Sequence, residues 1–428
     1  MTKPLWLALL VVASGVDFNA RLKAIIPDDT WTPEAAPAAP PVTLAQHEAA
    51  LRADKSHTNA FTVQSVVGPP TATRVLFVVP QFHRSPLLPI TWSSLGEAIA
   101  GVQSNIDFTL TRLVRAHGVR CVGTEGTWLD TMARSTELDQ VAGWLWDLER
   151  TRGHAASLLP GDDGGGADAE MAKVQTLITP YIQRHAQMLD GAGMALARLQ
   201  LTAETASLSV LRFGLEDEKL NTRSLTLLHT MRPLEEELSL LQPDGEDDAE
   251  DALAAIWRDE WPRFKAEVGT PLQAAMKSLQ ARRTLLLRDG DDVEAAALGR
   301  FTTLAGGVVE EVLRLDSALA YEEYYSTLRT RKAVPRTALK APSAQQKRRI
   351  RELQTRLKPL QAEYERVAST QREHAAVRRT LERLGATAVG RCALVMGANH
   401  VDGLVAAARK QGGDGVGILV VSPYPDNP

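Results

Sequence analysis

Hydrophobic and polar residues follow two different patterns along the chain. Near both ends, short apolar runs stand between turns rich in glycine and proline, which is typical of strands buried on both faces of a sheet. These runs are residues 74–79, 119–122, 392–396 and 416–422. From about residue 129 to residue 385, apolar residues instead recur every three or four positions, which indicates helices.

The first two strands enclose a long amphipathic helix. Residues 94–117 carry apolar side chains at helical spacing, and Gly118 follows at the position where a helix commonly ends. A strand, a helix and a strand with short connections form a βαβ unit, so the two strands should be parallel. Residues 61–67 alternate in polarity and predict an edge strand, and residues 44–54 predict a short helix.

The pattern as a whole predicts an α/β fold that is predominantly helical. Its mostly parallel sheet is built from both ends of the chain, with a large all-helical insertion between them. The expected parts are a secretory signal at 1–15, a linker and short helix at 16–60, an α/β core at 61–128 and 386–428, and the insertion at 129–385.

One helix of the insertion, residues 344–385, carries a heptad stripe. Its apolar residues are spaced three and four apart, with His374 on the same stripe as a polar member; they are Ile350, Leu353, Leu357, Leu360, Tyr364, Val367, Val377, Leu381 and Leu384. Such a stripe packs against one or two partner helices. An antiparallel mate is offered by Val174, Leu177, Tyr181, Met188 and Leu199. A homodimer through the same helix is the other way to cover it.

The net charge and the first residues of the chain indicate which partners and which cellular compartment to expect. The net charge of -4 provides no basic surface for nucleic acid. Lys3 precedes the apolar residues 4–13, and the small residues Ser14 and Gly15 follow, which resembles a secretory signal and predicts export to the periplasm or beyond. A segment of the mature fold is the alternative. No other stretch is apolar enough over the roughly 20 residues that a membrane span needs.

The chain has two cysteines, Cys121 and Cys392, and each lies inside a predicted strand. Two cysteines are too few for a zinc site of thiolates or for a disulfide scaffold. Buried thiols are expected, or one disulfide if the two strands are neighbours in an oxidising compartment.

Polar residues that carry chemistry follow three of the apolar strands. The first strand leads to His83, the second to Glu125, and the late strand to His400 after a turn at Gly397. Because parallel strands bring their carboxyl ends to one edge, these side chains should converge. Imidazole and carboxylate groups can bind a divalent metal that activates water. Without a metal, the same set can supply a histidine general base oriented by a carboxylate.

These motifs resemble the TraB/Tiki group of the erythromycin-esterase/ChaN-like superfamily. The late Gly-x-x-His of that group corresponds to Gly397 and His400, with Gly403 following, and its strand-two glutamate corresponds to Glu125. The segment at 213–218, Phe-Gly-Leu-Glu-Asp-Glu, resembles the group's Gly-Leu-Glu motif and brings in Glu216. The first motif departs from the pattern, since Pro80 stands where the group has glycine, although His83 keeps its place.

The resemblance implies a metal-assisted hydrolase of peptide or ester bonds that acts on a peptide or a small molecule. The implied catalytic residues are His83, Glu125, Glu216 and His400, of which His83, Glu125 and His400 would bind Mn, Co or Zn. Arg134 and Arg223 are candidates for binding a substrate carboxylate, with His229 as a weaker addition to the cleft. For Glu216, a solvated carboxylate at a helix start is the alternative.

Two other functional classes compete with the hydrolase. A non-catalytic protein of the same fold can bind haem or a metal through these histidines, with an axial ligand from Tyr321, Tyr324 or Tyr325. A helical scaffold, in which the heptad helix binds a partner, is the third hypothesis.

Overall fold

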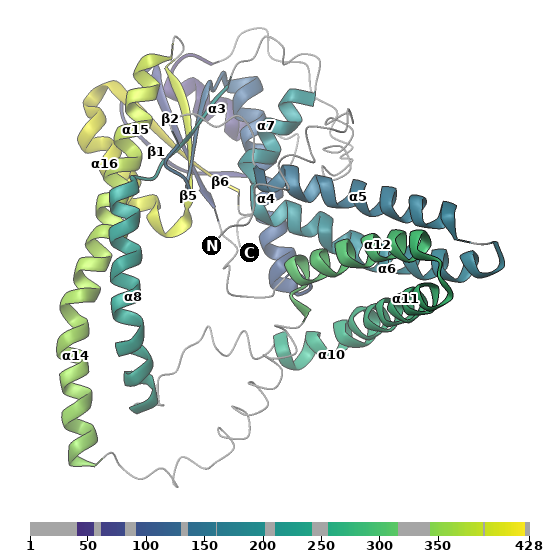
Figure 1. The fold of residues 1–428 in the computed structure, drawn as a ribbon. Helices are drawn as coiled ribbons and strands as arrows, with labels where there is room; N and C mark the ends of the chain where they lie inside the picture. The colour runs from purple at the N-terminus through teal and green to yellow at the C-terminus, as the bar shows by residue number, and fades with distance from the viewer. Residues whose placement is uncertain are drawn as a thin grey trace.

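The computed structural model shows a sheet domain from which two helical arms project (Figure 1). It describes residues 41–54, 61–81, 91–129, 136–159, 161–201, 210–241, 256–315, 343–387 and 390–423. The predicted signal at 1–15 lies outside these residues. Within them, no helix combines the length and the apolar character that crossing a membrane requires.

A six-stranded sheet forms the centre of the molecule, in the order β1-β6-β2-β5-β3-β4. The strands are β1 (Thr62–Val67), β2 (Arg74–Gln81), β3 (Cys121–Thr124), β4 (Leu211–Gly214), β5 (Arg391–Gly397) and β6 (Val416–Ser422). All neighbours are parallel except the edge strand β1, which runs antiparallel to β6. The predicted mostly parallel sheet, with strands from both chain ends and a helical middle, is therefore confirmed.

Helices cover both faces of the sheet, which is why its strands are almost wholly apolar. Phe77 and Val79 point to one face and pack with α3 (Leu44–Ala53), α4 (Ser94–His117) and α7 (Gly191–Leu201). Leu76 and Val78 point to the other face and pack with α15 (Arg372–Ala386) and α16 (Val401–Gly412). The strand period of two thus sorts one continuous apolar run into two cores.

The predicted βαβ unit is present. Helix α4 spans the expected residues, is capped by the Ser93 side chain and ends at Gly118, whose φ of 69° is left-handed. Strands β2 and β3 are parallel as expected, and β5 from the far end of the chain lies between them. Strand β5, from the end of the chain, therefore lies between the two strands of the βαβ unit formed by β2, α4 and β3.

The middle of the chain contributes one strand that the sequence analysis missed. Residues 211–214 lie inside the stretch expected to be helical, yet they form β4 beside β3. Four residues are too few to show a period of two, so only the pairing with β3 reveals the strand. A Cβ atom at Gly214 would collide with the carbonyl of Thr127, so glycine lets the two segments approach closely.

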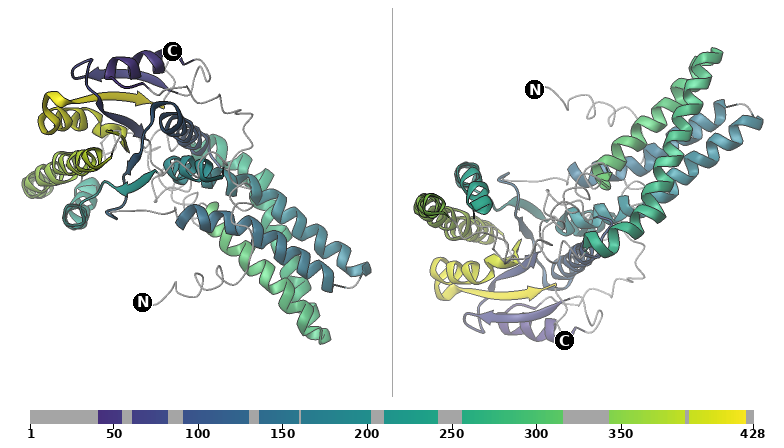
Figure 2. Two further views of the ribbon diagram at one scale, coloured as in Figure 1. Left: turned by 90° about the horizontal axis from the view of Figure 1, so that it is seen from above. Right: turned by 90° about the horizontal axis from the view of Figure 1, so that it is seen from below.

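One arm is a bundle of helices (Figure 2). Its helices are α5 (Thr136–Leu158), α6 (Gly161–Leu189), α11 (Thr270–Asp289) and α12 (Asp292–Val312). Directly before α11, the short helical segments η2 (Ile256–Glu260), α10 (Trp261–Phe264) and η3 (Lys265–Gly269) lead into the bundle. Trp92, just before α4, packs against Trp257, Trp261 and Phe264, which joins the bundle to the sheet domain.

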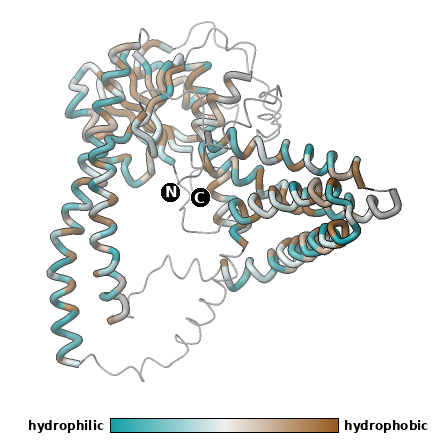
Figure 3. The backbone as a smooth tube through the Cα atoms, in the orientation of Figure 1, coloured by the Kyte–Doolittle hydropathy of each residue, from teal (hydrophilic) through white to brown (hydrophobic). Residues whose placement is uncertain are grey.

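The other arm pairs α8 (Glu218–Leu241) with α14 (Ala344–Glu365). The predicted heptad helix is present as α14, a π-helical stretch η5 (Arg366–Gln371) and α15 in direct succession. Leu353 and Leu357 of its stripe pack on Met231 and Leu234 of α8. In Figure 3 this arm is largely hydrophilic with hydrophobic residues at intervals, as expected for a two-helix seam.

The predicted mate of the heptad helix was wrong. Of the proposed residues, Val174, Leu177 and Tyr181 belong to the bundle core, Met188 packs on α4, and Leu199 packs on the sheet. The stripe itself divides, because Val377 and Leu384 of α15 pack on the sheet rather than on a helix arm. Periodicity defines an apolar stripe but not its partner.

His374 accepts a hydrogen bond from Gln411 of α16 through its backbone oxygen, at 3.1 Å.

The two cysteines lie at paired positions of β3 and β5, with Cα atoms 4.6 Å apart, and form a disulfide. The strands are therefore the neighbours that a disulfide requires. The bond links the early βαβ unit to the strand that returns 271 residues later.

Two buried histidines join α3 to the end of α4. The Nδ1 atoms of His47 and His117 lie 3.0 Å apart, so one ring donates and the other accepts, and both rings pack edge-on to Phe77. Burial, with the charges of the other histidine and Arg391, lowers the pKa of His47 to about 3. Burial and the nearby arginines Arg112 and Arg391 lower the pKa of His117 to about 4, against a smaller opposing effect of Asp54.

This pair predicts acid-sensitive stability. Both imidazoles take up a proton near pH 6.5 in the unfolded chain but near pH 3 to 4 in the fold. The contribution of the two neutral imidazoles to the free energy of unfolding is therefore complete above pH 6.5. As the pH decreases below that value, the free energy of unfolding falls by about 1.4 kcal/mol per pH unit for each imidazole. Urea denaturation between pH 7 and pH 5 should show a flatter slope for His47→Phe. His229→Phe, at an exposed site on α8, should keep the wild-type slope; equal slopes in all three chains would contradict the assignment.

Candidate functional site

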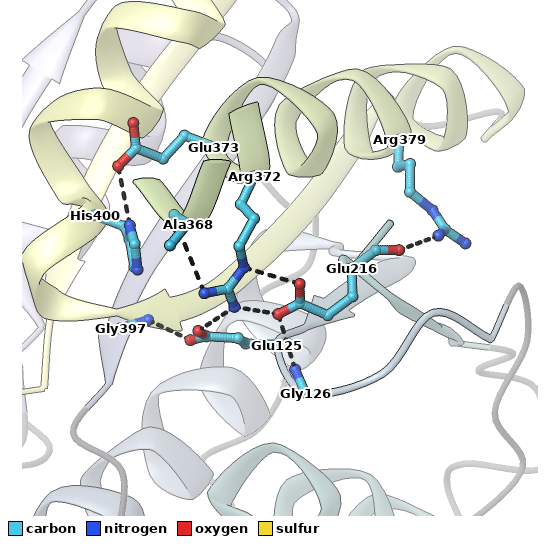
Figure 4. Close-up of polar contacts among 9 residues, drawn as sticks. All are labelled: Glu125, Gly126, Glu216, Ala368, Arg372, Glu373, Arg379, Gly397 and His400. Carbon is cyan, nitrogen blue, oxygen red and sulfur yellow. Dashed lines mark hydrogen bonds and ion pairs between the residues drawn. The ribbon is translucent and has the colours of Figure 1, made fainter. Parts of the chain in front are cut away.

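Two of the predicted glutamates meet at the carboxyl edge of the sheet (Figure 4). Glu125 directly follows β3, and Glu216 lies two residues after the neighbouring strand β4. Parallel pairing of β3 and β4 brings the two carboxylates to one place. The alternative of a solvated helix-start carboxylate is wrong for Glu216, whose side chain is only 4% exposed.

Arg372 of α15 binds both glutamates. Its Nε donates to Oε2 of Glu216 at 3.0 Å, and its Nη2 donates to Oε1 of Glu216 and, at 2.9 Å, to Oε1 of Glu125. Burial alone would lower the pKa of the Arg372 guanidinium, but hydrogen bonds and charge attraction to Glu216 and then Glu125 outweigh burial and raise it. One cation between two carboxylates leaves the cluster with one net negative charge.

Backbone amides complete the binding of these carboxylates. Gly397 N–H donates to Oε2 of Glu125 at 2.7 Å, and Gly126 N–H lies 3.5 Å from Oε1 of Glu216. Hydrogen bonds from amides and a guanidinium favour the ionised form of a carboxyl group. Because Gly397 begins the turn that leads to His400, the Glu125 carboxylate also fixes that turn.

A second arginine of α15 holds the backbone around the glutamates. Arg379 donates to the carbonyl oxygen of Glu216 at 2.5 Å and to that of Trp128 at 3.0 Å. The amide of Glu216 donates in turn to the carbonyl of Thr127 at 3.0 Å. The loop after β3, the segment after β4 and helix α15 are thus joined at one edge.

His400 is paired with a glutamate that the sequence analysis did not select. Its Nδ1 lies 2.9 Å from Oε1 of Glu373, which is 8% exposed and directly follows Arg372 on α15. A Cβ atom at Gly403 would collide with the Glu373 carboxylate, so the glycine after the late motif makes room for it. The other ring nitrogen, Nε2, points away from Glu373 (Figure 4) and makes no hydrogen bond to the described residues.

The π-helical stretch η5 ends immediately before these two residues. A π-helical turn carries an extra residue, so it shifts which side chains face the sheet, and such turns are frequent at functional sites. After it, Arg372 reaches Glu125 and Glu216 while Glu373 reaches His400 (Figure 4). The carbonyl of Ala368, inside the stretch, lies 3.4 Å from Nη1 of Arg372. The sequence showed Arg372 and Glu373 only as polar positions of a heptad helix, among the nine residues between Val367 and Val377.

The remaining candidates do not join this site in the described chain. Arg223 is exposed on α8 and pairs with Glu363, so it bridges the two helices of the arm, and His229 is exposed on the same helix. His83, Arg134, Tyr321, Tyr324 and Tyr325 lie outside the described residues.

The described residues do not by themselves fit the predicted metal. Among them, no group of three or more His, Cys, Asp or Glu side chains is arranged to hold an ion. Both oxygens of Glu125 already accept hydrogen bonds, from Arg372 and Gly397. Metal and haem binding therefore stay predictions that depend on His83 or the tyrosines.

Removing the shared guanidinium should destabilise the fold. Arg372→Gln leaves two buried carboxylates without a counter-charge, which costs about 3 to 5 kcal/mol when one partner of a buried ion pair is lost. Urea denaturation at pH 7 measures this loss. Arg378→Gln, at an exposed position of the same helix, is the matched control. A similar loss of unfolding free energy in both variants would contradict the role of Arg372 as the counter-charge of the two glutamates.

Comparison with known proteins adds no assignment to this geometry. No family model, no curated protein and no solved structure matches the chain. The resemblance to the TraB/Tiki group consequently stays a prediction, carried by short motifs at Glu125, Glu216 and His400.

Proposed function

We propose that this chain is a hydrolase of ester or peptide bonds in which His400 is the general base. The observation that carries the proposal is the 2.9 Å hydrogen bond between Nδ1 of His400 and Glu373, which leaves Nε2 without a protein partner among the described residues. A carboxylate on Nδ1 holds the proton there and fixes the ring, so that Nε2 carries the lone pair that accepts a proton.

The reaction follows from that arrangement. Nε2 accepts a proton from water as the oxygen attacks the substrate carbonyl, and the imidazolium that forms is stabilised by Glu373. The same proton then passes to the leaving alkoxide or amine, which releases the acid and restores neutral His400. Helix α16 begins directly after His400, and amides at the amino end of a helix favour the negative charge that develops on the carbonyl oxygen.

Glu125, Arg372 and Glu216 act as positioning residues in this scheme. Arg372 and Glu373 are consecutive, so the guanidinium that binds two glutamates also fixes the backbone of the orienting carboxylate. Glu125 fixes Gly397 at the start of the turn that carries His400. Positioning of this kind matters because small displacements of a catalytic base lower the rate strongly.

Export remains part of the proposal, whereas metal binding stays a separate prediction, because the Nε2 lone pair of His400 cannot both bind an ion and accept a proton. A structural disulfide is typical of oxidising compartments and supports export. We propose a peptide or a small molecule as the substrate, because the proposed reaction cleaves ester or peptide bonds. Helix α8 covers part of the heptad stripe, and a homodimer through the rest of that helix stays a prediction.

Turnover of the purified full chain should be measured on a panel of nitrophenyl esters and fluorogenic peptides. Glu373→Gln should lower kcat by about 10²- to 10⁴-fold with a smaller change in KM, and His400→Gln should lower it at least as much, because each removes general-base catalysis. His374→Gln changes the histidine next to Glu373, which contacts α16 rather than the site, and should keep wild-type rates. Absence of turnover across the panel, or equal rates in all variants, would refute the proposal.

A further inference from the structure

A second cluster of charged residues lies at the opposite end of the strands that carry the candidate site. Arg120 directly precedes β3 and Arg391 begins β5, and the amide of Arg120 donates to the carbonyl of Arg391 at 3.1 Å. The next residues, Cys121 and Cys392, point to the face covered by α15 and α16. The two arginines therefore point together to the face covered by α4.

Each guanidinium uses one nitrogen to cap the end of α4. Nη1 of Arg120 donates to the carbonyls of Val114 and Val119 at 3.2 and 3.0 Å, and Nη1 of Arg391 lies 3.3 Å from the carbonyl of His117. A guanidinium has five N–H donors, and most of those on Arg120 and Arg391 are not used by the described residues. Arg391 is only 7% exposed, and its Nε is buried without a hydrogen-bond partner in the described part of the chain.

Several buried or partly buried arginines of the described chain form ion pairs with carboxylates, whereas Arg120 and Arg391 bind backbone carbonyls. Arg112 binds Asp54, Arg212 binds Asp190, and Arg372 binds two glutamates. For Arg120 and Arg391, no ion pair with a carboxylate occurs in the described part of the chain.

The electrostatic environment of the pair is correspondingly unfavourable for two cations. Burial lowers the pKa of Arg120, and burial together with the charge of Arg120 lowers the pKa of Arg391. The carboxyl end of a helix offers only about half a negative charge, which is less than two guanidinium groups require.

We propose that Arg120 and Arg391 form a binding site for a small tetrahedral oxyanion, as inorganic phosphate or as the phosphate group of a small ester. Two guanidinium groups that bind carbonyls at the same helix end, with further N–H donors not used by the described residues, match such an anion in charge, and a guanidinium can bind it in bidentate fashion. The burial of Arg391 limits the part of the ligand that reaches it to a small group. Strand β5 separates this site from His400 by about 20 Å, at some 3.3 Å per residue, so it is independent of the proposed hydrolytic site.

The test is binding of inorganic phosphate to the full chain, measured by isothermal titration at fixed ionic strength with chloride as the reference anion. Thermal denaturation under the same conditions provides a second readout, because a ligand that binds only the folded chain raises Tm. Wild type should show saturable binding and a higher Tm. Arg120→Gln and Arg391→Gln should each lose at least about 10-fold in affinity, consistent with loss of a charge-assisted hydrogen bond.

Two further variants test whether lost phosphate binding reflects loss of the site rather than loss of the fold or of positive charge in general. Arg120→Lys retains the charge and should fold if Arg120→Gln does not, yet it should bind phosphate more weakly because it lacks the planar fork. Arg74→Gln removes an exposed arginine at the start of the adjacent strand β2 and should bind like wild type.

Glycerol phosphate distinguishes the two sources of the anion. Tighter binding than that of inorganic phosphate assigns the site to a phosphate ester, and equal or weaker binding assigns it to the free anion. Phosphate that stabilises wild type no more than chloride does, or binds equally to wild type and both Gln variants, would overturn the proposal.

Discussion

Burial of two carboxylates at one edge of the sheet is the constraint on which the site depends. Glu125 and Glu216 follow neighbouring strands and keep only 11% and 4% of their side chains exposed, so they need a counter-charge. Arg372 supplies it from a helix more than 150 residues later in the chain. Because the next residue on that helix is Glu373, neutralising the glutamates also brings the orienting carboxylate to His400.

The helix that carries Arg372 and Glu373 belongs to two parts of the molecule. Its first half, α14, packs on α8 as an arm, and its second half, α15, packs on the sheet. The π-helical stretch η5 between α14 and α15 shifts which side chains of the helix face the sheet, and Arg372 and Glu373 follow it directly. The arm and the site therefore share one continuous helix, and their positions are mechanically linked.

The two ends of the sheet differ in charge because of what each end must satisfy. At the carboxyl end, the glutamates bind backbone amides and an arginine. At the amino end, Arg120 and Arg391 meet the carbonyls that close α4. Strand β5 runs between the two clusters, from Arg391 to the turn before His400, with an apolar body that is fully buried.

The sequence by itself determined the local elements and their order. Apolar runs marked the long strands, the three-to-four spacing marked α4 and the heptad helix, and strand ends marked Glu125 and His400, because these signals depend on residues close together in the chain. The short strand β4, the α8 partner of the stripe, and the roles of Arg372 and Glu373 were decided only by tertiary structure. A four-residue strand has no visible period, an apolar stripe does not name its partner, and a charged residue on a helix looks solvated until a buried carboxylate or imidazole is placed beside it.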